Sequence, residues 1–182
     1  MSQYLLPAAF TLFVWWFSTG VILYLGRLPA WTFKWTMLKS TLLLSFAIVG
    51  LSISASRTTV SSAYCAFTCA LLIWGWQEIA FLLGYVTGAR RSECPVDSHG
   101  WRRAWLATEA ILHHEFALVV LAMLVFAVSW NKPNQTGWWT YLVLWTMRLS
   151  AKLNLFLGVR NLSENFLPAH RSEEHTSELQ SH

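Results

Sequence analysis

The stretch "LLPAAFTLFVWWFSTGVILYLG", residues 5–26, decides the fold class because it carries no charged side chain over 22 residues. About 20 apolar residues in a helix, each rising about 1.5 Å, cross the hydrocarbon core of a bilayer. Residues 1–4 contain no Lys or Arg, whereas a signal peptide starts with basic residues. We therefore expect an uncleaved membrane-spanning helix here.

The composition extends this expectation to the whole chain. Of 182 residues, 55% are hydrophobic and 12% are charged, against about 25% charged in soluble domains. No strand alternation or internal repeat is visible. We predict an all-α, polytopic transmembrane helix bundle that forms a single domain over residues 1–170. Its five expected spans are residues 5–26, 37–56, 61–86, 104–130 and 138–159.

The end of the sequence differs from the rest. Residues 171–182, "RSEEHTSELQSH", are abruptly polar and resemble the translation of a sequencing adapter. We treat them as a non-native, disordered tail. We expect the natural chain to continue past His170.

Basic residues predict the orientation, because cytoplasmic loops are enriched in Lys and Arg. The second expected loop has Arg57 and the fourth has Lys132. The first and third expected loops, together with the helix ends beside them, hold Arg27, Lys34, Lys39, Arg90, Arg91, Arg102 and Arg103. The N-terminus is therefore expected on the outer, periplasmic side. The basic third loop (Arg90, Arg91, Arg102 and Arg103) is suited to anionic lipid or to an acidic partner surface.

Ionisable residues also occur inside the expected spans. Counted from the cytoplasmic boundary at about 1.5 Å per residue, Glu78, Glu109 and Lys152 lie about 8–9 Å deep. His113 and Arg148 lie about 14–15 Å deep by the same count. Unpaired charges in hydrocarbon are costly. We therefore expect one intramembrane polar cluster formed by Glu78, Glu109, His113, Arg148 and Lys152.

This cluster is compatible with several roles. Its ion pairs could fix the register of the helices. His113 or His114, facing an apolar cleft, could ligate the metal of a tetrapyrrole. A metal centre on Glu109 and His113 would need a third donor such as Glu78, and a proton or solute pathway is a further alternative. The sequence contains no hydrolase signature, so we predict no catalytic residue and no metal site.

Four stretches resemble a known family. They are "VWWFSTGVILYL", "WGWQEIAFLLGYVTGARRSECP", "GWRRAWLATEAILHHE" and "LWTMRLSAKLNLFLGVRNLSENFLP". They resemble the PuhE-type photosynthetic complex assembly protein 2 family of anoxygenic phototrophic bacteria. The last stretch is the most specific of the four, and the resemblance covers residues 1–170.

The resemblance implies a multi-pass protein of the bacterial inner (cytoplasmic or intracytoplasmic) membrane. It implies a role in assembling the reaction-centre and light-harvesting complex, together with modulation of bacteriochlorophyll supply. The implied partners are the lipid bilayer and photosynthetic complex subunits or other assembly factors, with no nucleic acid. Bacteriochlorophyll or another tetrapyrrole is the cofactor that this role would involve. The alternative is a membrane enzyme or transporter that acts on a tetrapyrrole or its precursor.

Overall fold

The computed structural model describes the backbone of residues 2–86 and 101–156, and the side chains of residues 4–86 and 113–151. By its contacts the chain divides into two compact units, Met1–Leu144 and Trp145–His182. Each unit is described by itself below.

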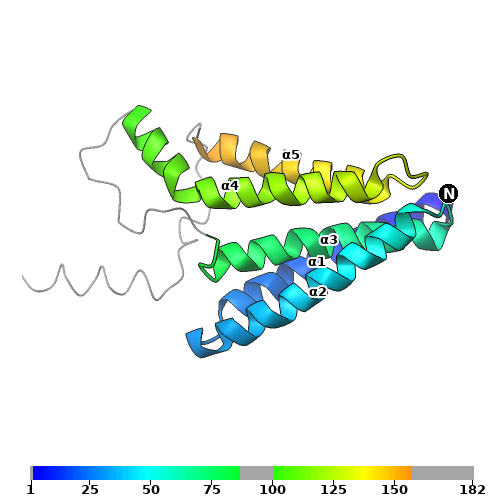
Figure 1. The fold of residues 1–182 in the computed structure, drawn as a ribbon, viewed down its shortest axis with the longest axis horizontal. Helices are drawn as coiled ribbons and strands as arrows, with labels where there is room; N and C mark the ends of the chain where they lie inside the picture. The colour runs from blue at the N-terminus through cyan, green and yellow to red at the C-terminus, as the bar shows by residue number, and fades with distance from the viewer. Residues whose placement is uncertain (1, 87–100, 157–182) are drawn as a thin grey trace, which may run out of the picture. The chain divides into compact units, whose positions relative to one another are not determined.

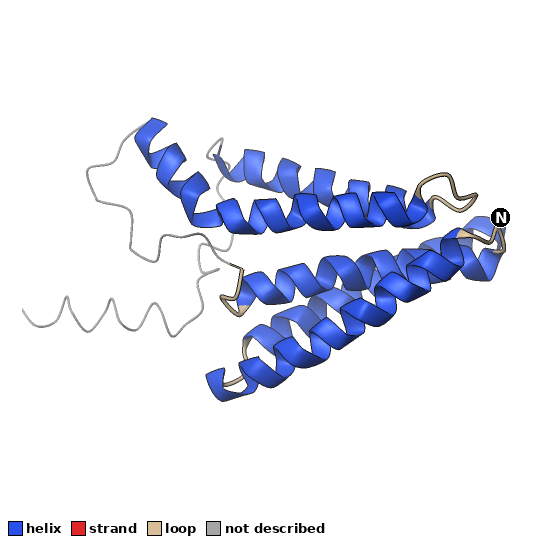
Figure 2. Cartoon of the chain, in the orientation of Figure 1, coloured by secondary structure: helices blue, strands red, loops and turns tan. Residues whose placement is uncertain are grey.

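The described residues are helical and contain no strand (Figures 1 and 2). The elements are α1 (Ser2–Gly26), the short 3-10 helix η1 (Ala30–Thr32), α2 (Phe33–Ala55), α3 (Val60–Leu82), α4 (Trp101–Ser129) and α5 (Thr136–Phe156). The predicted all-α class is confirmed. Lys34, Arg102 and Arg103, which the sequence placed in loops, lie instead in the first turns of α2 and α4.

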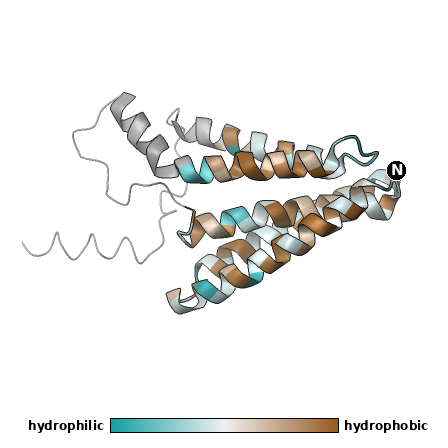
Figure 3. Cartoon of the chain, viewed as in Figure 1, coloured by the Kyte–Doolittle hydropathy of each residue, from teal (hydrophilic) through white to brown (hydrophobic). Residues whose placement is uncertain are grey.

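Three stretches of the described chain are long and apolar enough to cross a membrane: Tyr4–Gly26, Ala30–Ala55 and Val60–Leu82. The described part of α4 adds a shorter apolar stretch, His113–Ser129. The described residues therefore support three membrane-crossing helices and do not support the expected count of five. Figure 3 shows hydrophobic residues in brown along α1, α2 and α3, with paler and a few hydrophilic turns between them.

These three helices differ in how much of their apolar part is buried within the molecule. Half of the most apolar part of α3 is buried, against 17% for α2 and 0% for α1. Large apolar side chains therefore cover the outside of α1; Leu12 and Trp16, for example, are 63% and 70% exposed. A surface of this kind is stable in a lipid bilayer, whereas in water it would drive association.

The contact between α2 and α3 relies on small residues. Ala66 and Ala70 of α3 and Ala47 and Ala55 of α2 are all almost fully buried. A Cβ atom at Gly50 would lie 2.9 Å from the sulfur of Cys69. Small side chains let two helix backbones approach closely in a membrane, where helices associate through packing. Cys69, which is 8% exposed, therefore packs against the backbone of α2 at Gly50.

The beginning of α5 approaches the same pair of helices. A Cβ atom at Gly137 would clash with the side chain of Leu51 on α2 and would lie 3.4 Å from the carbonyl oxygen of Ala66 on α3. Leu51 is only 1% exposed and has little room to move. Glycine is therefore required at position 137.

The connection between α4 and α5 is tied to the end of α2. The side-chain amide of Asn134 donates to the carbonyl oxygen of Ser54 at 3.0 Å, and its backbone N–H donates to that of Ala55 at 3.1 Å. The Asn134 side-chain oxygen accepts from the backbone N–H of Thr136 at the start of α5. One side chain thus satisfies the polar backbone at two helix ends.

A glycine contact and the Asn134 hydrogen bonds show that the helices alternate in direction. Gly26, at the end of α1, lies beside Leu82, at the end of α3. The α1–α2 connection and the end of α3 therefore share one end of the first unit, and the α2–α3 and α4–α5 connections share the other. This is the alternation expected of consecutive antiparallel helices.

The third helix is shorter than the sequence predicted. It ends at Leu82, whereas the apolar run continues to Val86. Gly84 adopts a left-handed φ of 79°, with the N–H of Tyr85 bonded to the carbonyl oxygen of Ala80 and the N–H of Gly84 bonded to that of Phe81. This pattern is a Schellman motif, which glycine favours because it has no Cβ.

We expect Gly137→Val to lower the free energy of unfolding by on the order of 1–3 kcal/mol, because the added methyl groups overpack a filled interior. The measurement is unfolding of the purified protein in detergent, followed by circular dichroism. Gly20→Val is the matched control, since a Cβ atom at Gly20 would meet nothing within 4 Å. Equal stability losses in the two variants would contradict the close approach of α5.

Candidate functional site

Three polar side chains lie fully inside the first unit, one from each of α3, α4 and α5. Gln77, His114 and Tyr141 are all 0% exposed. We call them the polar core. Burying polar groups in an apolar interior is costly unless they are hydrogen bonded.

Two hydrogen bonds of the polar core reach backbone carbonyls of α4. The Gln77 side-chain amide donates to the carbonyl oxygen of His114 at 3.0 Å. The Tyr141 hydroxyl donates to the carbonyl oxygen of Leu118, also at 3.0 Å. His114 and Leu118 are four residues apart, so the two acceptors lie on one face of α4.

Aromatic rings of α3 close the polar core. The Phe81 ring lies 4.4 Å from the His114 ring between centroids, and the Trp74 ring meets Tyr141 edge-on at 5.4 Å. Trp74, Gln77 and Phe81 are spaced three and four apart, which brings them to a single face of α3. The His114 imidazole and the Tyr141 phenol therefore pack against aromatic rings on the face of α3 that also carries Gln77.

The structure describes part of the predicted intramembrane cluster. Glu78 is half-buried on α3 and His113 is exposed on α4. The side chains of Glu109 and Lys152 lie outside the described residues, and Arg148 belongs to the second unit. Pairing between Glu109 and Lys152 therefore stays a prediction.

The two adjacent histidines have different surroundings. His114 belongs to the polar core and is fully buried, whereas His113 is exposed on the outside of α4. An axial ligand of a tetrapyrrole needs an accessible ring nitrogen, which favours His113 of the two. Among the residues that the structure describes, no three His, Cys, Asp or Glu side chains gather into a set that could hold a metal ion.

The predicted basic loop is described only in part. Arg90 and Arg91 lie outside the described residues. Arg102 and Arg103 belong to the first turn of α4, but their side chains also lie outside the description. A function for this loop stays a prediction.

Sequence reasoning missed Gln77, Tyr141 and Asn134. Each is an uncharged polar residue in or beside an apolar helix. The predicted cluster was built from ionisable residues alone, such as the neighbouring Glu78. A usable signal existed in "WGWQEIAF", where Gln77 interrupts the apolar run one position before Glu78. Neutral amides and hydroxyls commonly bond across helices in membranes.

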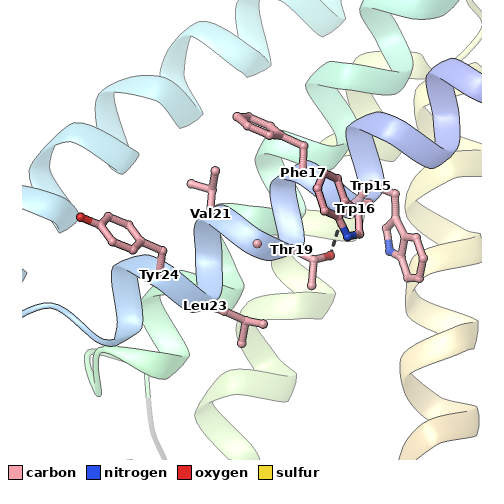
Figure 4. Close-up of a pocket in the computed structure, with 8 residues that line it drawn as sticks. Trp15, Trp16, Phe17, Thr19, Val21, Leu23 and Tyr24 are labelled. Atoms are coloured by element: carbon pink, nitrogen blue, oxygen red, sulfur yellow. Dashed lines mark hydrogen bonds between the residues drawn. The ribbon is translucent and has the colours of Figure 1, made fainter.

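A second feature is a shallow hollow on the outer face of α1. It measures about 410 Å³ and is lined by Trp15, Trp16, Phe17, Thr19, Gly20, Val21, Leu23 and Tyr24. The tryptophan rings stand at one end and Tyr24 at the other (Figure 4). The Thr19 hydroxyl donates to the carbonyl oxygen of Trp15 at 2.8 Å, so its hydrogen bond is made within α1.

Gly20 forms the floor of this α1 hollow. A Cβ atom there would meet nothing within 4 Å, whereas Gly26, Gly50, Gly75 and Gly137 each approach a neighbouring helix. Glycine inside a helix is destabilising by about 0.5–1 kcal/mol relative to alanine. The internal packing of the described chain does not use the space at Gly20.

The chain is similar in sequence to known proteins. Residues 1–176 match the model of a family described as "Protein of unknown function (DUF3623)". The chain belongs to the DUF3623 family. This DUF3623 chain is also 37% identical over 172 residues to a protein of Rhodobacter capsulatus called "Uncharacterized 30.4 kDa protein in puhA 5'region". No solved structure matches the chain.

The alignment with the Rhodobacter capsulatus protein covers 92% of this chain and 63% of that protein. The DUF3623 chain therefore spans less than two thirds of this relative's length.

We expect Tyr141→Phe to reduce the free energy of unfolding by about 0.5–1.5 kcal/mol, because it removes only the buried hydroxyl and its bond to Leu118. The phenyl ring should keep its contact with Trp74. Tyr24→Phe, which changes a hydroxyl that is on the outside of α1, is the matched control. Denaturant unfolding in detergent measures both, and unchanged stability of Tyr141→Phe would contradict the role of this bond.

If Glu109 and Lys152 pair, Glu109→Ala should lower stability by on the order of 1–3 kcal/mol, since an unpaired ammonium remains in the membrane. The double variant Glu109→Ala/Lys152→Ala should recover part of that loss. A double-mutant cycle on unfolding in detergent measures the coupling. Simply additive losses would rule out the pair.

Proposed function

We propose that this protein is a PuhE-type assembly factor, embedded in the bacterial inner membrane, for the photosynthetic reaction-centre and light-harvesting complex. Modulation of bacteriochlorophyll supply would be part of that role. Membership of the DUF3623 family and the relative named for the puhA 5' region are compatible with a place among photosynthesis genes. The role itself is non-enzymatic.

The exposure of α1 carries this proposal. One face of α1 packs against α3, where the Phe10 ring lies 4.6 Å from the Tyr64 ring. No residue in the apolar part of α1 is fully buried, so the rest of the helix surface is presented to the bilayer. An assembly factor needs such a surface, because it must hold membrane subunits temporarily through van der Waals packing. The α1 hollow is the place on it where a partner helix could approach most closely, across Gly20.

We further propose that all five helices cross the membrane, with the N-terminus on the periplasmic side. The alternation of the connections supports this topology. Arg27, Lys34 and Lys39 lie at the end shared with the last turn of α3, and Arg57 and Lys132 lie at the other end. The more basic end faces the cytoplasm in most membrane proteins.

The direct test is deletion of the gene in the host bacterium, followed by near-infrared absorbance of its membranes. Assembled reaction-centre and light-harvesting complexes should fall severalfold relative to total bacteriochlorophyll, and the complete gene should restore them. An unchanged complex content would overturn the proposal. Turnover of a tetrapyrrole precursor by the purified protein would identify an enzyme instead.

Gly20→Leu should fail to restore complex assembly, because the leucine side chain fills the α1 hollow. The variant should still accumulate and unfold like the original protein, since position 20 has no internal neighbour. Val49→Phe is the control, because it adds bulk to the exposed face of α2. Full restoration by Gly20→Leu would show that the α1 hollow has no part in assembly.

A further inference from the structure

A second hollow lies where α4 ends and α5 begins. It measures about 400 Å³ and is lined by Phe126, Trp130, Asn131, Gln135, Trp138 and Trp139. Small-molecule sites in proteins usually measure about 300–1,000 Å³. We call it the tryptophan pocket; it is separate from the α1 hollow and from the polar core.

Aromatic rings form the walls of the tryptophan pocket. The Phe126 ring lies 4.8 Å from that of Trp130 at an angle of 61°, and 4.9 Å from that of Trp138 at 59°. Both indoles therefore stand at steep angles to one phenyl ring. Trp130 and Trp139 remain 65% and 62% exposed, so their faces are accessible from outside.

The polar rim of the pocket is held in place by hydrogen bonds. The Gln135 side-chain amide donates to the carbonyl oxygens of Ser129 at 2.7 Å and of Lys132 at 2.8 Å. Asn131 adopts a left-handed φ of 53°, and Asn134 ties the connection to α2. A connection fixed at this many points presents its rim in one arrangement, which lowers the entropy cost of binding.

The charge of the rim and the place of the pocket at the end of membrane helices indicate the kind of ligand. The exposed ammonium of Lys132 lies in the connection that forms the rim, and it attracts an anion. Indole faces attract a cation, most effectively a quaternary ammonium that has no hydrogen bonds to lose. A ligand with both charges, located at the end of membrane helices, is a zwitterionic phospholipid.

We propose that the tryptophan pocket binds the phosphocholine headgroup of a phospholipid, with the trimethylammonium against Trp130 and Trp138 and the phosphate toward Lys132. Phosphatidylethanolamine has the same phosphate, but its primary ammonium donates hydrogen bonds to water and loses them among indoles. The pocket should therefore distinguish the two lipids through its aromatic walls. Tryptophans at membrane interfaces are common, but a scattered belt would not make this distinction.

The test is native mass spectrometry of the purified protein in detergent, titrated separately with phosphatidylcholine, phosphatidylethanolamine and phosphatidylglycerol of the same acyl chains. The original protein should retain phosphatidylcholine most strongly. Trp138→Leu should weaken that binding about fivefold to thirtyfold, as expected for the loss of one cation–π contact, and should abolish the preference over phosphatidylethanolamine. Lys132→Gln should weaken both lipids while keeping the preference.

Trp16→Leu in the α1 hollow is the matched control and should leave lipid selectivity unchanged. If Trp138→Leu does not fold, Trp130→Leu replaces it, because that ring is largely exposed and its loss disturbs packing less. Equal retention of phosphatidylcholine and phosphatidylethanolamine by the original protein would overturn the proposal. So would preferential retention of phosphatidylglycerol, which would indicate simple attraction of an anionic lipid to Lys132.

Discussion

The constraint on which this structure depends is that hydrocarbon offers no hydrogen bonds to the polar groups placed in it. A helix satisfies its own backbone, so helices fill the described chain. Where the chain must turn or carry polar side chains, the protein supplies the partners itself. Asn134 binds the carbonyls at the end of α2, and Gln77 and Tyr141 donate to carbonyls of α4. These contacts join a side chain to the backbone of another helix, whereas the Trp76 indole of α3 donates to the Thr41 hydroxyl of α2 at 3.0 Å.

A second constraint on the structure is how closely the helices can approach one another. Gly50 and Gly137 permit contacts with Cys69 and Leu51 that a larger residue would prevent. These contacts hold α2, α3 and the start of α5 closely together, whereas α1 packs on α3 with one face and exposes the rest. The same arrangement that stabilises the interior therefore leaves an exposed aromatic helix for interaction with lipid or protein. The α1 hollow and the tryptophan pocket both lie on surfaces that the internal packing does not need.

The candidate site was predictable only in part. Charge in an apolar segment drew attention to Glu78, Glu109 and Lys152, and pairing among them remains a prediction. The fully buried polar residues are instead the neutral Gln77 and Tyr141, together with His114. A sequence shows that a polar residue lies in a membrane helix, but the cost of burial depends on its partners. For Gln77 and Tyr141 those partners are backbone carbonyls of α4, which no residue pattern reveals.

The sequence by itself determined the helical class, the approximate position of each helix and the membrane environment, because these follow from the length of apolar runs. It placed the end of α3 too late, at residue 86, because the apolar run continues past the left-handed turn at Gly84. Only the tertiary structure decided which face of each helix turns inward, and so that His114 rather than His113 is enclosed. The physical reason is that lipid and protein interior are equally apolar, so a membrane helix has no polar face to mark its outside.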